Sequence, residues 1–232
     1  MSRMHDPRHG GHRAPAVVDD DVDVFGAEAA AARLTERLEE VGRSASGGAG
    51  GGSQVLRPPF GATRDRVDGP ASAGATLLVF GAYGAPSARS LGAVLATVRE
   101  RHLTNVAVAW RHYPDPIAHP RAAVLALAAE AAAARGKFWV FTRAMLELRH
   151  DDPTDLHTAL LRAGLDPRGT LDAMRAGIGA QRIAGDVASA LESGVESAPT
   201  LFINGERYRG ELDPDAVSAA IELALSSRGS RV

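Results

Sequence analysis

The alternation of apolar and polar residues predicts a strand, a helix and a second strand in the middle of the chain. The run ATLLVFG, Ala75 to Gly81, is short and apolar and ends at glycine, as a buried strand would. Pro86 suits the first position of a helix, where its missing N–H costs nothing. The stretch NVAVAWRHY, Asn105 to Tyr113, is rich in β-branched and aromatic residues. Between these strands, apolar residues recur at helical spacing at Leu91, Val94, Leu95 and Val98.

The remaining pattern predicts helices, then a hairpin and a closing helix. A helical block runs from about His119 to Arg149 with a break near Gly136, and further helical segments continue to about Ser193. Asn204-Gly205, between APTLFING and RYRG, is a strong two-residue hairpin signal. The last helix begins after Asp213, a suitable N-cap residue. Strand, helix, strand, an all-helical insertion at about residues 115–193, hairpin and helix make up an α/β thioredoxin-like topology.

The first part of the chain has a different composition. Residues 1–25 are polar and predict a disordered tail. Residues 26–42 are rich in helix formers and predict a short helix. Residues 43–54 are a Gly/Ser-rich linker. We therefore expect the folded domain to occupy residues 55–232 and the chain before Val55 to be an appendage.

Composition excludes several classes of function. The 232 residues include no cysteine, which excludes disulfides, thiolate metal sites and cysteine-based catalysis. The net charge of −2 argues against nucleic acid as the main partner. The N-terminus lacks the apolar core of a secretory signal, and the longest apolar run, Ala122 to Ala134, is too short to span a bilayer and contains Glu130. We expect a soluble cytoplasmic protein with no cofactor.

Several short motifs occur in an order that resembles one family. They are DRVDGPASAGATLLVFGAY, WRHYP, HPRA, AAEAAAARGKFW, GLD and GVESAPTLFINGERYRG. The segment from about Asp65 to Leu225 is similar to the DsbA-like thiol–disulfide oxidoreductases. It is most similar to the bacterial subgroup that occurs both as soluble proteins and fused to sodium/proton antiporters. The resemblance implies a thioredoxin-like fold with an all-helical insertion.

The resemblance also implies an active-site turn whose sulfur is missing here. The cysteine, proline, any residue, cysteine motif of the family falls on Ala85, Pro86, Ser87 and Ala88. In such a motif the helix N-terminus favours the thiolate of the first cysteine, and the second cysteine resolves the mixed disulfide. Alanine can do neither, so the usual disulfide exchange is chemically impossible.

A second element of the family site does not need sulfur. The family's cis-proline loop falls on Ala198-Pro199. It offers backbone groups to an extended peptide, a form of strand addition. The acidic residue that the family usually carries at the position of Ala82 is also absent. Because an engineer removing thiols has no reason to change that residue, we interpret the loss as natural rather than engineered.

Other candidate residues have simpler interpretations. Ser87 invites comparison with glutathione-using relatives, but their serine occupies the position of Ala85, so Ser87 is better explained as a first-turn helix residue. Tyr83 could donate to a ligand or pack beside the turn. His112 and His119 have no obvious acid or nucleophile partner and predict structural histidines. The tail could offer metal ligands, although no fold fixes their geometry: His5, His9, His12, Asp19, Asp20, Asp21 and Asp23.

Two hypotheses follow. The first is a redox-inactive module that binds a peptide or protein partner in the former active-site groove, formed by Tyr83, Ala85, Pro86, Ser87, Ala198 and Pro199. The second is an enzyme, either an oxidoreductase by family assignment or a glutathione-dependent transferase or isomerase that uses Ser87 or Tyr83. Glutathione binding that is sensitive to Ser87→Ala or Tyr83→Phe would favour the enzyme.

Overall fold

The computed structural model describes residues 25–45, 54–148 and 154–229. Within these residues one mixed sheet has the strand order β1-β3-β2-β4-β5. Strands β2 and β3 are parallel, and both β1 on β3 and β4 on β2 are antiparallel. The strands are β1 (Arg66–Asp68), β2 (Ala75–Gly81), β3 (Val106–His112), β4 (Thr200–Ile203) and β5 (Glu206–Arg207).

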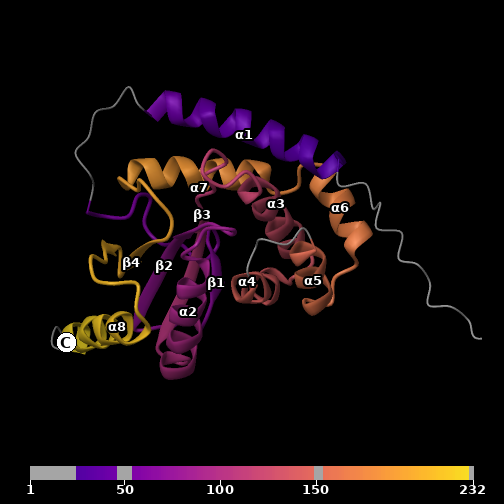
Figure 1. The fold of residues 1–232 in the computed structure, drawn as a ribbon. Coiled ribbons are helices and arrows are strands. Elements are labelled where there is room, and N and C mark those ends of the chain that lie inside the picture. Colours follow the sequence, from indigo (N-terminus) through magenta and orange to yellow (C-terminus); the bar gives the residue numbers. More distant parts are fainter. Residues whose placement is uncertain (1–24, 46–53, 149–153, 230–232) are drawn as a thin grey trace, which may run out of the picture.

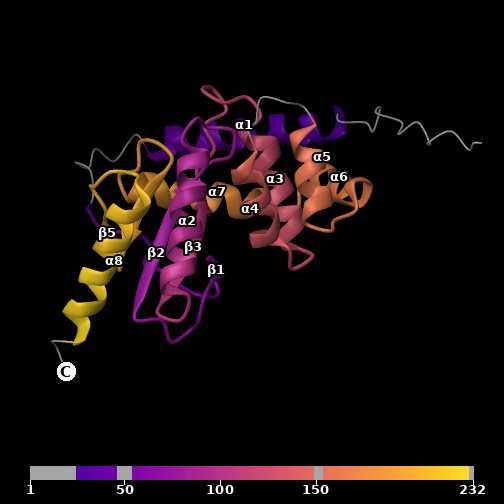
Figure 2. The same cartoon turned by 60° about the horizontal axis from the view of Figure 1, so that its bottom comes forward.

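Helices cover both faces of the sheet (Figures 1 and 2). On one face, α2 (Ala88–His102) and α8 (Pro214–Gly229) pack against alternate residues of β2, including Leu77 and Val79. On the other face, α7 (Ala180–Glu192) lies against the intervening residues Leu78 and Phe80. Every residue of β2 except Thr76 is buried, and Thr76 is also its only polar residue, so the strand is almost entirely apolar, as the sequence pattern predicts.

Among the described residues between β3 and β4, every regular element is a helix. These helices are α3 (Ala122–Ala133), α4 (Phe138–Glu147), α5 (Asp155–Arg162), α6 (Pro167–Arg175) and α7. Gly136, where the sequence predicts a break, has φ of 68° and separates α3 from α4. The thioredoxin-like fold with a helical insertion is therefore confirmed. The sequence pattern did not identify β1, a short edge strand of three residues.

The closing hairpin and helix form for the expected local reasons. Asn204 and Gly205 both have positive φ, 50° and 84°, as a two-residue turn of this kind requires. The side chain of Asp213 accepts hydrogen bonds from the N–H groups of Asp215 and Ala216, both at 3.0 Å, and so caps α8.

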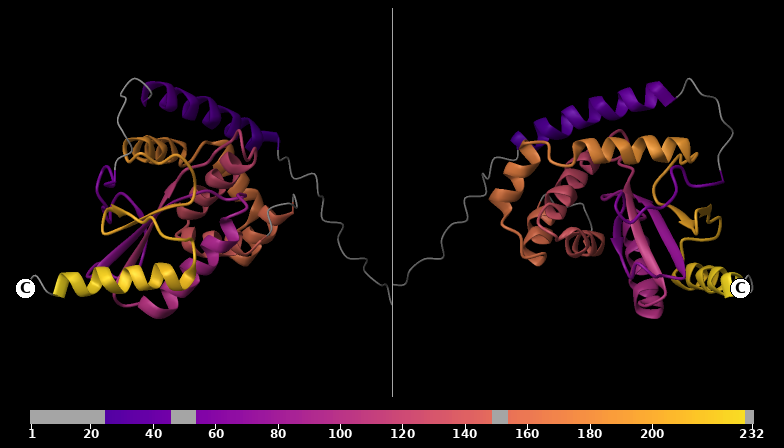
Figure 3. Two further views of the ribbon diagram at one scale, coloured as in Figure 1. Left: turned by 60° about the vertical axis from the view of Figure 1, so that its left-hand side comes forward. Right: turned by 180° about the vertical axis from the view of Figure 1, so that it is seen from behind.

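The helix expected at residues 26–42 is longer, α1 (Phe25–Ala45), and it is not an appendage. It packs across α3, α6 and α7 (Figures 1 and 3). Leu34 is only 1% exposed and belongs to the main core together with Ala27, Ala30, Ala31 and Leu38. The expectation that the folded domain starts near Val55 is therefore wrong, because the apolar face of α1 finds its partners in helices distant in sequence. Residues 1–24 and 46–53, with the histidine-bearing tail and most of the linker, lie outside the described residues.

Candidate functional site

The turn that leads from β2 to α2 places small side chains where the family motif has thiols. The N–H of Ala88 donates to the carbonyl of Ala85 at 2.9 Å, which closes the turn. The side chains of Ala85 and Ala88 are largely covered, at 7% and 1% exposed, and Pro86 between them is exposed. Methyl groups thus occupy both positions, and the turn has no group that could attack a disulfide.

The Ala198–Pro199 loop lies beside the same end of β2. The peptide bond between these residues is cis. Thr200, the next residue, pairs with Phe80 near the end of β2, so the loop sits at the edge of the sheet from which the turn departs. Within the described part of the chain, neither the N–H nor the C=O of Ala198 has a hydrogen-bond partner. Ala198 is half-buried, so its N–H can donate a hydrogen bond to an added strand and its C=O can accept one from it.

A third loop, residues 113–121 between β3 and α3, starts at the same edge. The N–H of Tyr113 donates to the carbonyl of Gly81 at 2.9 Å, which joins this loop to the start of the turn. The carboxylate of Asp115 accepts from the N–H groups of Ile117 and Ala118 at 3.0 Å. The side chain of Ile117 is 89% exposed. Sequence reasoning missed Ile117, and the one available signal was an isolated apolar residue in a proline-rich loop.

Of the predicted site residues, Tyr83 is buried in the core and Ser87 lies at the start of α2. Tyr83 is 1% exposed, stacks on Trp110 with 5.2 Å between ring centroids, and shares a 2.8 Å hydrogen bond with the hydroxyl of Thr142. Burial raises the pKa of the Tyr83 hydroxyl. Tyr83 is therefore a core residue. The prediction that it lines a binding groove is wrong, because its ring is buried against Trp110. Ser87 is half-buried and makes no side-chain capping bond at the start of α2.

A buried polar cluster lies behind the turn, at the end of β3. Nε2 of His112 lies 3.2 Å from a carboxylate oxygen of Glu130, and the backbone N–H of His112 donates to Asp186 at 3.0 Å. All three residues are 3% exposed or less. The expectation that His112 has no acid partner is therefore wrong, because its partners come from α3 and α7. Nε of Arg66 also donates to Glu130, at 3.1 Å.

The pKa values of the two carboxyl groups in this cluster are shifted in opposite directions. Burial raises the pKa of Asp186 to about 6. Burial also acts to raise the pKa of Glu130, but hydrogen bonds from His112 and Arg66 outweigh it and bring that pKa to about 2. Because the cluster is enclosed by protein, it presents no surface to a substrate. It ties the helical insertion to the sheet.

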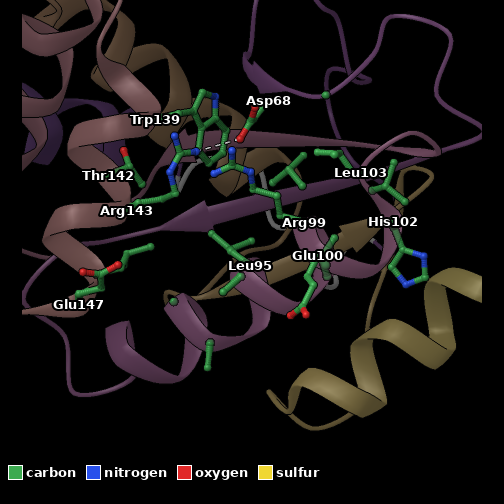
Figure 4. A pocket seen from close by; sticks show the side chains of 18 of the residues that line it. Asp68, Leu95, Arg99, Glu100, His102, Leu103, Trp139, Thr142, Arg143 and Glu147 are labelled. Atoms are coloured by element: carbon green, nitrogen blue, oxygen red, sulfur yellow. Dashed lines mark hydrogen bonds and ion pairs between the residues drawn. The ribbon is translucent and has the colours of Figure 1, made fainter. Parts of the chain in front are cut away.

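A separate pocket of about 800 Å³ lies between α2, α4 and the β1–β3 part of the sheet (Figure 4). None of the predicted site residues lines it. Its walls are mainly apolar side chains, among them Leu95, Val98, Leu103, Val106, Val108 and Leu146. Charged and aromatic side chains also line it: Asp68, Arg89, Arg99, Glu100, Trp139, Arg143 and Glu147.

Comparison with known proteins decides the family. Residues 65–223 match the model of the family described as thioredoxin. The chain belongs to the thioredoxin family. Its fold is also that of solved DsbA-like proteins. Oxidised BdbD of Bacillus subtilis superposes with a TM-score of 0.66 at 18% identity, over 75% of this chain and 99% of that one. The α-DsbA1 of Wolbachia pipientis gives 0.62 at 14% identity, over 75% and 96%.

The curated relatives of this thioredoxin-family chain are longer proteins. Na⁺/H⁺ antiporter NhaA 3 of Salinispora tropica is 38% identical over 205 residues, covering 84% of this chain and 30% of that protein. Na⁺/H⁺ antiporter NhaA 1 of Mycolicibacterium gilvum is 32% identical over 174 residues, covering 74% and 28%. The chain thus spans about 30% of the length of these relatives. Among the described helices, none is both long and apolar enough to cross a membrane.

Proposed function

We propose that this thioredoxin-family chain is a redox-inactive module that binds an extended segment of another polypeptide. The segment would lie along the edge where the turn at Ala85, the Ala198–Pro199 loop and the loop carrying Ile117 meet. The observation that carries the proposal is the backbone of Ala198, whose N–H and C=O have no partner among the described residues, beside a turn without thiols. Backbone groups of this kind bind a strand without any sulfur chemistry.

The side chains around these backbone groups fit the same role. Ala85 puts a methyl group, 7% exposed, where a reactive thiol would stand in the family, so the turn offers an apolar contact and no reactive atom. Ile117 adds an exposed apolar contact from the neighbouring loop. In strand addition, main-chain bonds supply affinity and side-chain contacts supply specificity, so Ala198 would supply the first and Ile117 the second.

The relatives suggest a class of partner. In proteins named Na⁺/H⁺ antiporters, a segment similar to this chain makes up about 30% of the length. We therefore propose an antiporter of this kind as the protein whose extended segment is bound. The glutathione-dependent alternative loses Tyr83, which is buried, and keeps only Ser87 as a candidate.

A peptide array tests the binding function with the full chain. Overlapping twelve-residue peptides from the non-membrane segments of an NhaA-type antiporter would be probed, and each binding peptide measured by calorimetry. We expect Ile117→Asp and Ala85→Trp each to weaken binding at least about tenfold. Leu223→Asp, at a 70% exposed leucine on α8, is the matched control and should leave affinity unchanged.

Two further measurements separate strand addition from other modes. Methylating single backbone nitrogens of the bound peptide should abolish binding at alternate positions, because a strand directs alternate N–H groups toward its neighbour. Glutathione should neither bind to the protein nor compete with the bound peptide. The proposal would be overturned if neither Ile117→Asp nor Ala85→Trp weakened peptide binding. It would also be overturned if the protein turned over glutathione and Ser87→Ala abolished that activity.

A further inference from the structure

The pocket between α2 and α4 has the size and lining of a small-molecule site. It is separate from the proposed peptide-binding edge at Ala85, Ile117 and Ala198–Pro199, called the peptide edge below. Its volume of about 800 Å³ lies in the range of about 300–1,000 Å³ typical of ligand pockets. Leu103 lines it while remaining 61% exposed, whereas Val106 and Val108, which line the same pocket, are buried. A ligand with an apolar body would cover this surface.

The charges around the pocket are not evenly distributed. Nη1 of Arg143 donates to the carboxylate of Asp68 at 3.0 Å, which pairs these two residues. The side chain of Arg99 has no hydrogen-bond or ion-pair partner among the described residues. Figure 4 shows its guanidinium extending toward Arg143 and Trp139. Arg99, Arg143 and Asp68 together leave one positive charge at this end of the pocket.

The remaining acidic side chains do not neutralise that charge. Glu147 lines the pocket, but its carboxylate pairs at 3.5 Å with Arg162, a residue that does not line the pocket. The carboxylate of Glu100 points away from the Arg99 guanidinium in Figure 4. An anion placed between Arg99 and Arg143 would receive charge-assisted hydrogen bonds from two guanidinium groups.

We propose that this pocket binds small monocarboxylic acids with an apolar chain or ring. The carboxylate would lie between Arg99 and Arg143, and the apolar body would rest on Leu95, Val98 and Leu103. A single carboxylate matches the one positive charge that Arg99, Arg143 and Asp68 leave at this end of the pocket, and the guanidinium fork matches its planar geometry. Arg89 also lines the pocket and adds to its positive charge. The site shares no residue with the peptide edge, so it goes beyond the function proposed above.

Decanoate and decan-1-ol form a matched pair of probes, because they share an apolar chain and differ in charge. Titration of the full chain, followed by calorimetry and by the fluorescence of Trp139, should show decanoate binding with a Kd below about 1 mM. Decan-1-ol should bind at least about tenfold more weakly, since it lacks the charged hydrogen bonds.

Variants then assign the site. Arg99→Gln should weaken decanoate about tenfold or more and leave decan-1-ol unchanged. Arg101→Gln is the control: it removes the same charge from the same last turn of α2, but Arg101 pairs with Asp215 and does not line the pocket. It should alter neither probe. Ala96→Trp, at an exposed position in the lining, should block both probes by filling the pocket.

Each outcome decides the proposal. Selective loss of decanoate in Arg99→Gln together with loss of both probes in Ala96→Trp supports it. No decanoate binding, equal binding of the two probes, equal effects of Arg99→Gln and Arg101→Gln, or full binding to Ala96→Trp would each overturn it. Circular dichroism melts of every variant confirm that the binding changes occur in a folded protein.

Discussion

The indole nitrogen of Trp110 donates a hydrogen bond to Nδ1 of His112 at 3.3 Å, within one strand of the sheet. An indole N–H can only donate, so Nδ1 accepts, and the imidazole hydrogen lies on Nε2. Nε2 can then donate to Glu130, 3.2 Å away. The orientation of the buried polar cluster is therefore set by a tryptophan two residues before the histidine, and the cluster holds α3 against the end of β3.

Trp110→Phe should destabilise the protein by about 2–4 kcal/mol, because it leaves Nδ1 of His112 without a donor and removes volume from the core. Urea unfolding at pH 7 measures the change. Trp139→Phe is the control: the buried Nε1 of Trp139 has no hydrogen-bond partner, so its loss should cost less than about 1 kcal/mol. Equal costs for the two variants would show that the bond to His112 contributes nothing.

The raised pKa of Asp186 predicts stability that falls as the pH rises from about 4 to about 6. In the folded protein this buried carboxyl holds its proton up to about pH 6, whereas the unfolded chain loses it near its ordinary value of 3.8. The folded state therefore binds more protons in that window, and stability decreases by up to about 3 kcal/mol across it. Glu130, with its pKa lowered to about 2, has the opposite effect, mainly below its ordinary value of 4.5.

Asp186→Asn isolates this effect. The amide oxygen can still accept the N–H of His112 but carries no charge. We expect the variant to be more stable than the wild type at pH 7 and to show no decline between pH 4.5 and pH 6. Urea unfolding at a series of pH values measures both. A wild type whose stability rises through that window, or a variant with the same slope, would contradict the assignment.

The sequence predicted the elements that depend on local pattern. Strand β2, the break at Gly136, the hairpin at Asn204-Gly205 and the cap at Asp213 each follow from residues within a few positions of one another. The turn at Ala85 was located by motif order. The pairing of His112 with Glu130 and Asp186 could not be predicted, because it depends on how α3 and α7 pack against the sheet. The pocket likewise combines α2, α4 and two strands, and no single segment carries its signal.

The burial of α1 in the core could not be predicted from the sequence either, and its contribution to stability can be tested. Its composition indicates a helix, but only the packing against α3, α6 and α7 shows that Leu34 is buried in the main core. Leu34→Ala should lower the free energy of unfolding by about 2–4 kcal/mol in a single cooperative transition. Glu36→Ala, at an exposed position of the same helix, should change it by less than about 0.5 kcal/mol. An independent appendage would leave the main transition unchanged in both variants.

Restoring sulfur to the turn tests whether the frame of the redox site persists. The hydrogen bond from the N–H of Ala88 to the carbonyl of Ala85 holds these residues in a tight turn at the start of α2. We expect Ala85→Cys with Ala88→Cys to form a disulfide that dithiothreitol reduces reversibly. After reduction, the thiol introduced at position 85 should have a pKa below about 8.5, because it faces the helix N-terminus.

Thiol counting and the ultraviolet absorbance of the thiolate as a function of pH measure these two properties. Ala93→Cys with Ala96→Cys has the same spacing at two exposed positions inside α2, and should show no lowered pKa because no free helix N–H groups lie nearby. If the turn variant keeps unpaired thiols under oxidising conditions, its backbone is not arranged as a cysteine, proline, any residue, cysteine turn requires. The peptide edge proposed from that arrangement would then lose its main support, whereas the carboxylate pocket along α2 would be unaffected.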